Sequence, residues 1–596
     1  MSVYIAPLRE MLFAMKEVGG LDAICAQPDH EETTPDLVEA ILQEAANYAA
    51  GVLDPLNRPG DVQGARWHDG RVTPADGFRE AWASFCENGW NGMPAATEWG
   101  GQGLPTLVST AVLEMWKSSN LAFSLCQMLT LGAVEAIAHH GSDALQRRFL
   151  APMVEGRWTG TMNLTEPQAG SDLAALRSRA VPEGDHYRVS GNKIFITWGE
   201  HDMAENIVHL VLARVAGAPE GVKGISLFVV PKFLVNQDGS LGARNDAHCV
   251  SIEHKMGIKA RPTAVLQFGD HGGAVGYLVG QENRGLEYMF IMMNAARFGV
   301  GVQGIAIAER AYQKAVGYAK DRVQSRPVDG SMNASAAIIH HPDVRRMLMT
   351  MRAYTEGCRA MASTAAAAYD AAHHHPDAQV RKDNATFYEF MVPLVKGYST
   401  EMSLEVTSLG VQVHGGMGFI EETGAAQYYR DAKILTIYEG TTAIQANDLV
   451  GRKTARDGGQ SARAIAAQIE KTEGELLASG TPAAKAVARR LSAARQAFLD
   501  VVNFVAGGAK SSPNAVFAGS VPYLMLAGNL VAGWQLARSL LVAEALLPKG
   551  QDAAFLRAKI TTAQFYAEHI LVKAPGLRDS IVEGADSVTD LALEAF

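Results

Sequence analysis

The sequence contains few cysteines and no excess of positive charge. None of its five cysteines, Cys25, Cys86, Cys126, Cys249 and Cys358, has CxxC spacing. This argues against a disulfide framework, a zinc site or a redox pair. The 596 residues carry a formal charge of -10, which provides no electrostatic footprint for a nucleic-acid backbone or an anionic membrane. We therefore expect small molecules or proteins as partners, and no nucleic acid.

The sequence shows neither the pattern of an export signal at its start nor a clean membrane span. The first 20 residues place Glu10 and Glu17 among apolar residues and have neither a basic region nor a small-residue cleavage site. The most apolar late stretch, 521–547, is interrupted by four polar or charged residues, whereas a membrane helix needs about 20 apolar residues. We expect no membrane span, a buried helix at 521–547, and a cytoplasmic protein.

Changes in hydrophobic period divide the chain into segments. Apolar residues recur at helical spacing up to about residue 158, and short β-branched runs such as NIVHLVLARV then indicate antiparallel strands. Long helical patterns return until 453, and the polar segment TARDGGQSARA separates them from Ala- and Leu-rich helices. We predict an α+β multidomain protein with these boundaries: an N-terminal helical extension at 1–35, helices at 36–158, a β domain at 159–275, a helical bundle at 280–453, and an added helical domain at 461–596.

Two formal motif matches carry no chemistry. Gly299, Gly301 and Gly304 spell GxGxxG, but helical patterns precede and follow them, so we expect close helix packing and no dinucleotide fold. The histidines at 139–140, 340–341 and 373–375 lack cysteine or carboxylate partners at ligand spacing. We interpret them as solvated turns and expect no metal site.

Two neighbouring segments have the residue types that a flat polar ring system requires. In MNLTEPQAGSDLAALRS a predicted strand enters a loop whose backbone N–H groups lie near the hydroxyls of Thr165 and Ser171. In GNKIFITWGE, Phe195 and Thr197 are two residues apart, so a regular strand places them on the same face. An aromatic ring and a hydroxyl side by side can cover and hydrogen-bond a flavin. The alternative for the loop is an ordinary strand-to-loop turn.

A third segment, residues 412–453, contains a loop carboxylate. Glu439 lies in the turn YEGTT, before a predicted helix, and follows the apolar run ILTIY. A partly desolvated carboxylate has a raised pKa and suits a general base. The alternative is a solvated surface residue or a helix-capping partner.

Taken together, the three segments resemble the acyl-CoA dehydrogenase family over about residues 40 to 453. TEPQAGSD is similar to the family's flavin loop, GNKIFIT to its flavin-facing strand, and RDAKILTIYEGTTAIQ to its catalytic signature. The extra N-terminal piece and the domain after 460 resemble a long bacterial branch that includes 3-methylthiopropionyl-CoA dehydrogenases. The resemblance implies an N-terminal helical domain, a middle antiparallel β-barrel and a C-terminal four-helix bundle. It also implies FAD as cofactor, an acyl-CoA substrate, and a homodimer or dimer of dimers.

The resemblance also assigns residues to the site. Glu439 matches the catalytic base, and the family's other position for that base is Ala296 here, which cannot accept a proton. Arg322 matches an arginine that meets the FAD of a neighbouring subunit. The matched cofactor positions are Met162, Leu164, Thr165, Gly170, Ser171, Phe195, Thr197, Arg322, Gln412, Gly415, Gly416 and Thr441. The matched substrate positions are Ser171, Arg297, Tyr438 and Gly440.

Four departures from the family pattern stand near these positions. Phe195 replaces a common Trp, Trp198 a common Asn, Ala443 a common Gln, and Gln168 a common small residue. The implied reaction forms a trans-2-enoyl-CoA, from a fatty acyl-CoA or 3-methylthiopropionyl-CoA, with electron-transferring flavoprotein as acceptor. The alternatives are an acyl-CoA oxidase, or a flavin-containing nucleic-acid-binding relative. The second conflicts with the nearly balanced charges after residue 460.

Overall fold

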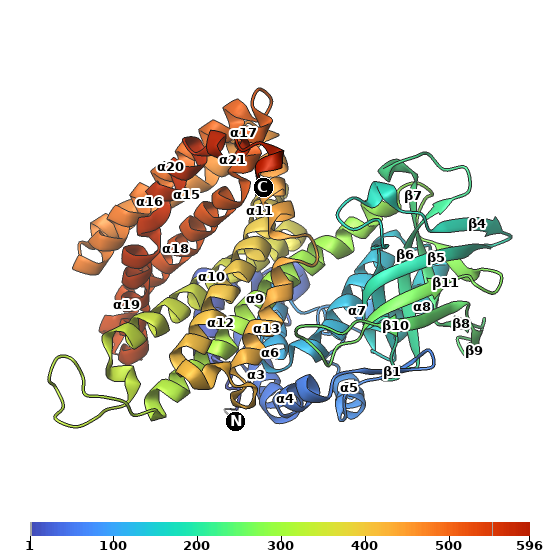
Figure 1. The fold of residues 1–596 in the computed structure, drawn as a ribbon, viewed down its shortest axis with the longest axis horizontal. Coiled ribbons are helices and arrows are strands. Elements are labelled where there is room, and N and C mark those ends of the chain that lie inside the picture. Colours follow the sequence, from blue (N-terminus) through green and yellow to red (C-terminus); the bar gives the residue numbers. More distant parts are fainter. Residues whose placement is uncertain (1–2, 551) are drawn as a thin grey trace. The chain divides into compact units, whose positions relative to one another are not determined.

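The computed structural model describes residues 3–550 and 552–596. The chain forms two compact units. The first comprises Met1–Ala46, Pro105–Ser118 and Val300–Phe596, and the second comprises Asn47–Leu104 and Ser119–Gly299. The helical and β segments predicted from the sequence are visible in Figure 1 as separate stretches of ribbon.

Helices precede the main sheet, as the apolar spacing predicted. Their bounds are α1 (Leu8–Phe13), α2 (Leu21–Cys25), α3 (Pro35–Tyr48), α4 (Asp54–Gln63), α5 (Phe78–Glu87), α6 (Thr106–Ser119), α7 (Leu121–His140) and α8 (Asp143–Val154). A short hairpin, β1 (Arg66–His68) and β2 (Arg71–Thr73), lies between α4 and α5. The side chains of Asn120 and Ser142 accept backbone N–H groups at the starts of α7 and α8. These caps explain why the helices begin there.

The β domain of the second unit closes into a barrel. Its strands are β3 (Trp158–Asn163), β4 (Arg179–Glu183), β5 (His186–Thr197), β6 (Asn206–Val215), β7 (Ile225–Pro231), β8 (Phe233–Val235), β9 (Leu241–Arg244), β10 (Ala247–Ile252), β11 (Thr263–Phe268) and β12 (Ala274–Leu278). The ring runs β4-β5-β12-β7-β6 and returns to β4, which pairs with both β5 and β6. The family fold implied from sequence is therefore confirmed for this domain.

From the sequence we expected an antiparallel barrel, but two strand pairs of this domain are parallel. β6 pairs in parallel with both β3 and β4. A parallel pair needs a long connection, and the segment from Asn163 to Asn206, which contains β4 and β5, provides one for β3 and β6. Alternating residue types alone could not distinguish this pairing, because both sheet types have a side-chain period of two.

Long helices follow the barrel. They are α9 (Gly285–Asp321), α10 (Pro342–His374), α11 (Ala378–Pro393), α12 (Ser399–His414), α13 (Ala425–Lys433) and α14 (Thr442–Val450). A π-helical turn, η8 (Leu394–Tyr398), joins α11 to α12. Within α9, a Cβ on Gly301 would lie 2.4 Å from the Val395 carbonyl oxygen. The GxGxxG spelling is therefore confirmed as close helix packing.

The last helices pack on this bundle in the first unit. They are α15 (Gln460–Ser479), α16 (Pro482–Gly508), α17 (Pro513–Ala518), α18 (Ser520–Leu546), α19 (Ala553–His569), α20 (Ala574–Val582) and α21 (Ala585–Thr589). α18 contacts both α10 and η8, and Figure 1 shows α18 and α19 as long red helices. The N-terminal segment joins them, because Lys559 pairs with both Glu10 and Glu356 at 2.7 and 2.8 Å.

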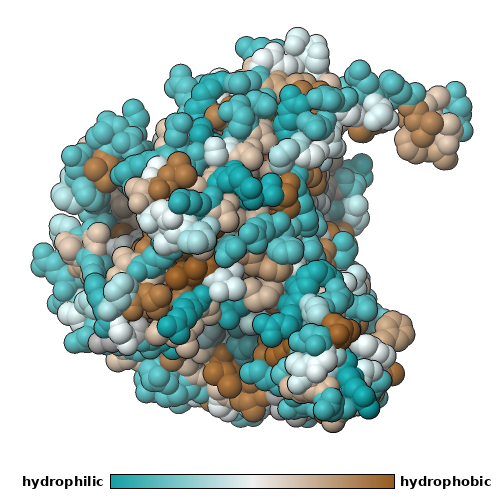
Figure 2. Space-filling view, turned by 90° about the vertical axis from the view of Figure 1, so that its left-hand side faces the viewer, coloured by the Kyte–Doolittle hydropathy of each residue, from teal (hydrophilic) through white to brown (hydrophobic). Residues whose placement is uncertain are grey.

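Among the residues that the structure describes, three helical segments are long and apolar enough to cross a membrane by length and composition alone. They are Leu121–His140, Gly285–Asp321 and Ser520–Lys549, and 83, 72 and 61% of their most apolar windows are buried within the chain. The last segment includes the predicted buried helix at 521–547. Its four polar or charged residues leave its mean hydropathy high enough for a membrane span, which we did not expect from the sequence. The face shown in Figure 2 is mainly hydrophilic, with smaller hydrophobic areas between.

Candidate active site

The predicted flavin loop is fastened by one buried carboxylate. Glu166 accepts the backbone N–H groups of Arg177 and Ser178 at 2.7 and 3.0 Å, which closes the segment between them. Its other partner is the buried ammonium of Lys193 on β5, at 2.8 Å. Burial alone would raise the pKa of Glu166, but Lys193 and the N–H and O–H donors lower it to about 2. Burial lowers the pKa of Lys193 to about 8, so the pair is ionised at neutral pH.

Hydrogen bonds join the predicted flavin loop to strand β5. The Ile194 N–H donates to the Thr165 carbonyl oxygen at 3.0 Å, and Lys193 Nζ donates to that of Leu164 at 3.0 Å. Met162, Leu164, Thr165 and Thr197 are half-buried, whereas Gly170, Ser171 and Phe195 are exposed. The predicted cofactor positions of this unit therefore lie at the end of β3, on the loop that follows it and on β5, with their small and aromatic members open to solvent.

Phe195 is held in an unusual backbone conformation. Between Lys193 and Ile196, strand β5 has one residue more than β11 opposite, which is a β-bulge. Phe195 lies in it with φ of 61°, and its side chain is 59% exposed. A bulky residue at positive φ costs about 1–3 kcal/mol, and such residues cluster at functional sites. Because of the bulge, the regular alternation assumed for Phe195 and Thr197 does not apply here.

Trp198 belongs to the core of the second unit. Its side chain is fully buried, and its indole N–H donates to the Ala122 carbonyl oxygen at 3.0 Å. The ring lies beside those of Phe78 and His201. The exchange of Asn for Trp at this position therefore adds packing between the strand end and the start of α7.

In the other unit, Glu439 lies on a tightly held turn. Its φ is 55°, again in the left-handed region, and it is half-buried. Tyr438 donates its hydroxyl to Gln303 Oε1 at 2.5 Å. Thr441 caps α14 by accepting the Ile444 N–H, and Gly440 has φ of 87°. The predicted catalytic turn is therefore a strained connection that ends at a capped helix.

Lys396 holds this turn from both sides. Its side chain is fully buried on η8, and Nζ donates to the carbonyl oxygens of Leu435 and Gly440, at 2.9 and 2.7 Å. Gln445 donates to the carbonyl oxygens of Glu439 and Gly440 at 3.4 and 3.3 Å. A charge-assisted hydrogen bond is roughly twice as strong as a neutral one. Lys396 is therefore the main anchor of the residues on either side of Glu439.

The residues predicted to meet a neighbouring subunit share one end of the bundle. Tyr318, near the end of α9, stacks on His414, at the end of α12, with ring centroids 4.3 Å apart. Arg322 follows α9, and Gln412, Gly415 and Gly416 lie at the end of α12; all four are exposed. A Cβ on either glycine would meet no atom within 4 Å.

Arg297 is buried in α9, in the unit that carries the loop. It donates to Asn294 Oδ1 at 3.4 Å, and its guanidinium lies 5.9 Å from the centre of the Phe290 ring. Arg297 is therefore not a residue of the exposed helix surface. Neighbouring Ala296 is also buried.

Sequence reasoning missed the anchoring residues Glu166, Lys193 and Lys396. One signal was available, because Lys396 is a single charge within the apolar run MVPLVKGY. A lone buried lysine needs fixed oxygen partners. The pairing of Glu166 with Lys193, 27 residues apart, depends on the fold and had no such signal.

Comparisons with known proteins match this organisation. Family models match in order: acyl-CoA dehydrogenase N-terminal domain (38–157), middle domain (161–271), C-terminal domain (283–453), and acetyl-CoA dehydrogenase C-terminal like (463–592). A 3-methylmercaptopropionyl-CoA dehydrogenase of Ruegeria pomeroyi is 52% identical over 99% of this chain and 100% of its own length. A broad-specificity linear acyl-CoA dehydrogenase of Mycobacterium tuberculosis is 35% identical, with all of both chains covered.

The fold is similar to that of a solved acyl-CoA dehydrogenase from Bacillus anthracis. That structure has a TM-score of 0.74 and 20% identity, and the match covers 95% of this chain and 90% of that one. The chain belongs to the acyl-CoA dehydrogenase family. Within the family it is similar over its whole length to the 3-methylmercaptopropionyl-CoA dehydrogenase of Ruegeria pomeroyi.

Proposed function

We propose that this chain is an FAD-dependent dehydrogenase of 3-methylmercaptopropionyl-CoA, which is 3-methylthiopropionyl-CoA, with Glu439 as the general base. The observation that carries this proposal is the Glu439 turn. A carboxylate at positive φ, between backbone groups held by Lys396, stands in the family's catalytic signature. The 52% identity to the Ruegeria pomeroyi enzyme supports the choice of substrate.

The residues of the loop and strand fit a flavin. Gly170 and Ser171 are exposed on a loop whose ends Glu166 fastens, and Phe195 presents a large aromatic side chain to solvent at the cost of backbone strain. Exposed Phe195 suits contact with a flat ring, and the Thr165 and Thr197 hydroxyls suit its polar edge. When bound, FAD supplies the oxidant, which accepts the β hydrogen of the substrate as a hydride.

The groups of this chain carry the proton chemistry. The Glu439 carboxylate accepts the α proton, while the two electrons of the α C–H bond form the new carbon–carbon double bond as the β hydrogen departs with its pair. The Glu439 backbone N–H stabilises the negative charge that develops on the thioester oxygen. Arg297, Tyr438, Gly440 and Ser171 contact the acyl-CoA, and Thr441 contributes to the cofactor side.

We propose a homodimer or a dimer of dimers. Arg322, Gln412, Gly415 and Gly416 are all exposed at one end of the bundle. Large apolar side chains near them are exposed too, including Val323, Met417 and Phe419 at 53, 49 and 84%. Exposed apolar groups beside polar ones are typical of a protein interface. Across it, these residues would bind the FAD of the neighbouring subunit.

The electron acceptor is proposed to be electron-transferring flavoprotein rather than oxygen. The relatives described above are named dehydrogenases, which favours this acceptor over the oxidase alternative. The five free thiols fit a reducing cytoplasm, where we place the protein. Mixing the reduced enzyme with oxygen or with electron-transferring flavoprotein separates the two acceptors, and faster reoxidation by oxygen would make the protein an oxidase.

A substrate panel tests the proposed activity. Purified yellow enzyme is mixed anaerobically with 3-methylmercaptopropionyl-CoA and with linear acyl-CoA esters of increasing length, and bleaching of the flavin is followed. We expect 3-methylmercaptopropionyl-CoA to bleach the flavin with the highest second-order rate constant. Higher values for long linear esters would instead favour the fatty acyl-CoA alternative, and no bleaching by any ester would overturn the dehydrogenase function.

A further inference from the structure

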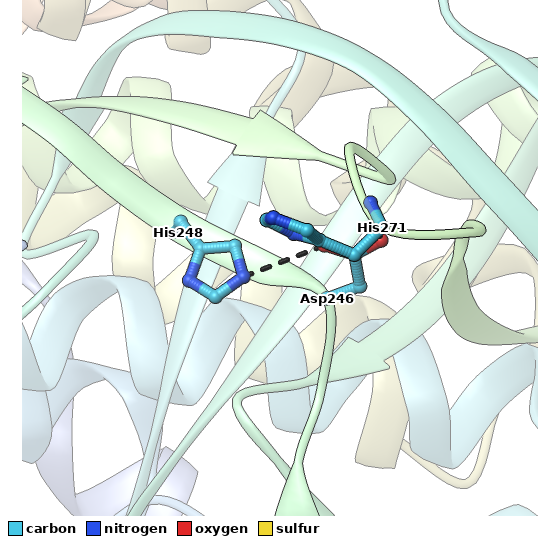
Figure 3. A group of neighbouring side chains, drawn as sticks. All are labelled: Asp246, His248 and His271. Carbon is cyan, nitrogen blue, oxygen red and sulfur yellow. Dashed lines mark hydrogen bonds and ion pairs between the residues drawn. The ribbon is translucent and has the colours of Figure 1, made fainter.

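Strand β10 and two loops beside it bring a carboxylate and two imidazoles together. Asp246 directly precedes β10, His248 lies on β10, and His271 lies in the turn between β11 and β12. Their potential ligand atoms lie within 4.8 Å of one another, and no second group of this kind occurs in the part of the chain that the structure describes. Figure 3 shows both rings beside the carboxylate. All three residues belong to the second unit, and none has a role in the proposed reaction.

The two imidazoles approach the same carboxylate oxygen. Asp246 Oδ1 lies 3.2 Å from His271 Nδ1 and 3.4 Å from His248 Nε2. Bonds of about 2.0–2.1 Å from a tetrahedral zinc ion place neighbouring ligand atoms about 3.3 Å apart. Both measured separations are close to this edge length. The third separation, between the two ring nitrogens, is at most 4.8 Å, so an approach of the two solvent-exposed rings would complete the triangle of ligand atoms.

The backbone around the group is already fixed. Asp246 Oδ2 accepts the backbone N–H groups of His271 and Gly273, at 2.6 and 3.2 Å, which leaves Oδ1 directed at the rings. The Gly269 N–H donates to the Asp246 carbonyl oxygen, and β10 pairs with β11 beside it. Outer hydrogen bonds of this kind orient the ligands of metal sites. The Asp246 side chain is 11% exposed, while His248 and His271 are open to solvent at 41 and 78%.

We propose that Asp246, His248 and His271 form a binding site for Zn²⁺ or a similar borderline divalent ion. Imidazole with one carboxylate suits zinc, cobalt, nickel or copper better than magnesium or calcium. Three protein ligands leave one position of the tetrahedron open to solvent. The site is separate from the proposed chemistry of Glu439 and does not depend on it.

Zinc titration by calorimetry tests the site, on protein that carries no polyhistidine tag and has been treated with a chelator. The test variant is His248→Ala with His271→Ala. The matched control is His139→Ala with His140→Ala, an adjacent histidine pair at the end of α7 in the same unit. We expect wild type and control to bind one more Zn²⁺ per chain than the test variant. Equal stoichiometry in all three proteins would overturn the proposal.

Cobalt gives a second, independent signal. Co²⁺ in a four-coordinate site absorbs visible light strongly, whereas cobalt in water does not. We expect this band in wild type and control and its loss in the test variant. Unchanged flavin content and far-ultraviolet circular dichroism would establish that the test variant is folded, so the lost band reports the ligands. The same band in the test variant would place the metal elsewhere and overturn the assignment.

Discussion

At the scale of single residues, buried charges fix the backbone of the site in both units. Lys193 and Glu166 hold the loop that carries the proposed flavin contacts, and Lys396 holds the turn of Glu439. A buried charge without partners costs several kcal/mol, so each of these groups constrains the backbone oxygens or N–H groups around it. Removing one of them should therefore change the geometry of the site as well as stability.

Lys396→Met is expected to slow flavin reduction by acyl-CoA about 100-fold, because a shift of about 1 Å in a catalytic group can cost that much. Acyl-CoA affinity should change little, since the bonds of Lys396 described above hold the backbone of the turn. Stopped-flow reduction at saturating substrate gives the rate. The control is Lys433→Met, an exposed lysine on α13 that should leave the rate unchanged. If flavin reduction in Lys396→Met had the wild-type rate, the Glu439 turn would not need Lys396 as an anchor.

Glu166→Gln tests the other anchor through pH. The folded pKa of about 2 lies below the ordinary value of 4.5. The carboxylate therefore stabilises the fold above pH 4.5, and the contribution is lost as pH falls from 4.5 toward 2. A shift of this size corresponds to about 3 kcal/mol. We expect a lower thermal midpoint for Glu166→Gln at pH 7, with the difference from wild type shrinking below pH 4.5.

Circular dichroism melts of both proteins across this range measure the difference. Glu183→Gln is the matched control, because that exposed carboxylate pairs with Arg188 at the surface and such pairs contribute little. A midpoint difference between wild type and Glu166→Gln that stays constant from pH 7 to pH 3 would contradict the ionised role of Glu166.

At the scale of elements, the added C-terminal helices support the π-helical turn that carries Lys396. Tyr398, also on η8, donates to Asn529 Oδ1 at 2.7 Å and lies 2.8 Å from the Tyr566 hydroxyl. Gly528 on α18 faces the Tyr398 ring, and a Cβ there would lie only 2.2 Å from Cγ. π-helical turns often occur at functional sites. We infer that α18 and α19 keep η8, and through it the Glu439 turn, in place.

Gly528→Ala is expected to push Tyr398 away and destabilise the fold by about 1–3 kcal/mol, as overpacking does. The rate of flavin reduction should fall with it, because Lys396 lies two residues from Tyr398. Gly474→Ala on α15 is the control: no atom lies within 4 Å of its added Cβ, so stability and rate should hold. A lower thermal midpoint with an unchanged rate would show that α18 stabilises the bundle without supporting the site.

The sequence predicted the elements of the site better than its local geometry. The order of helices, barrel and helices followed from hydrophobic period, and Phe195 and Glu439 could be singled out from short motifs. The bulge at Phe195, the burial of Trp198 and the parallel pairing of β3 with β6 could not, because each depends on strands that are distant in sequence. The same limit explains the group at Asp246 and His271, which strand pairing brings together across 25 residues.

At the scale of the whole molecule, the family relationship covers the chain from residue 38 to 592 with four models in series. The N-terminal segment and the last helices are parts of the first unit, since Lys559 links Glu10 to Glu356 on α10. The helices beyond residue 460 therefore pack as a continuation of the bundle. The predicted flavin loop belongs to one unit and Glu439 to the other.

Glu439→Gln tests the central claim most directly. The substitution keeps the volume and a hydrogen-bonding head but removes the proton acceptor, so the fold, FAD content and acyl-CoA binding should survive. Anaerobic stopped-flow mixing with 3-methylmercaptopropionyl-CoA should then bleach the flavin several orders of magnitude more slowly than in wild type. General base catalysis alone contributes about 10²–10⁴-fold, and departure of the β hydride depends on the same deprotonation. Bleaching near the wild-type rate would contradict the assignment of Glu439 as the base.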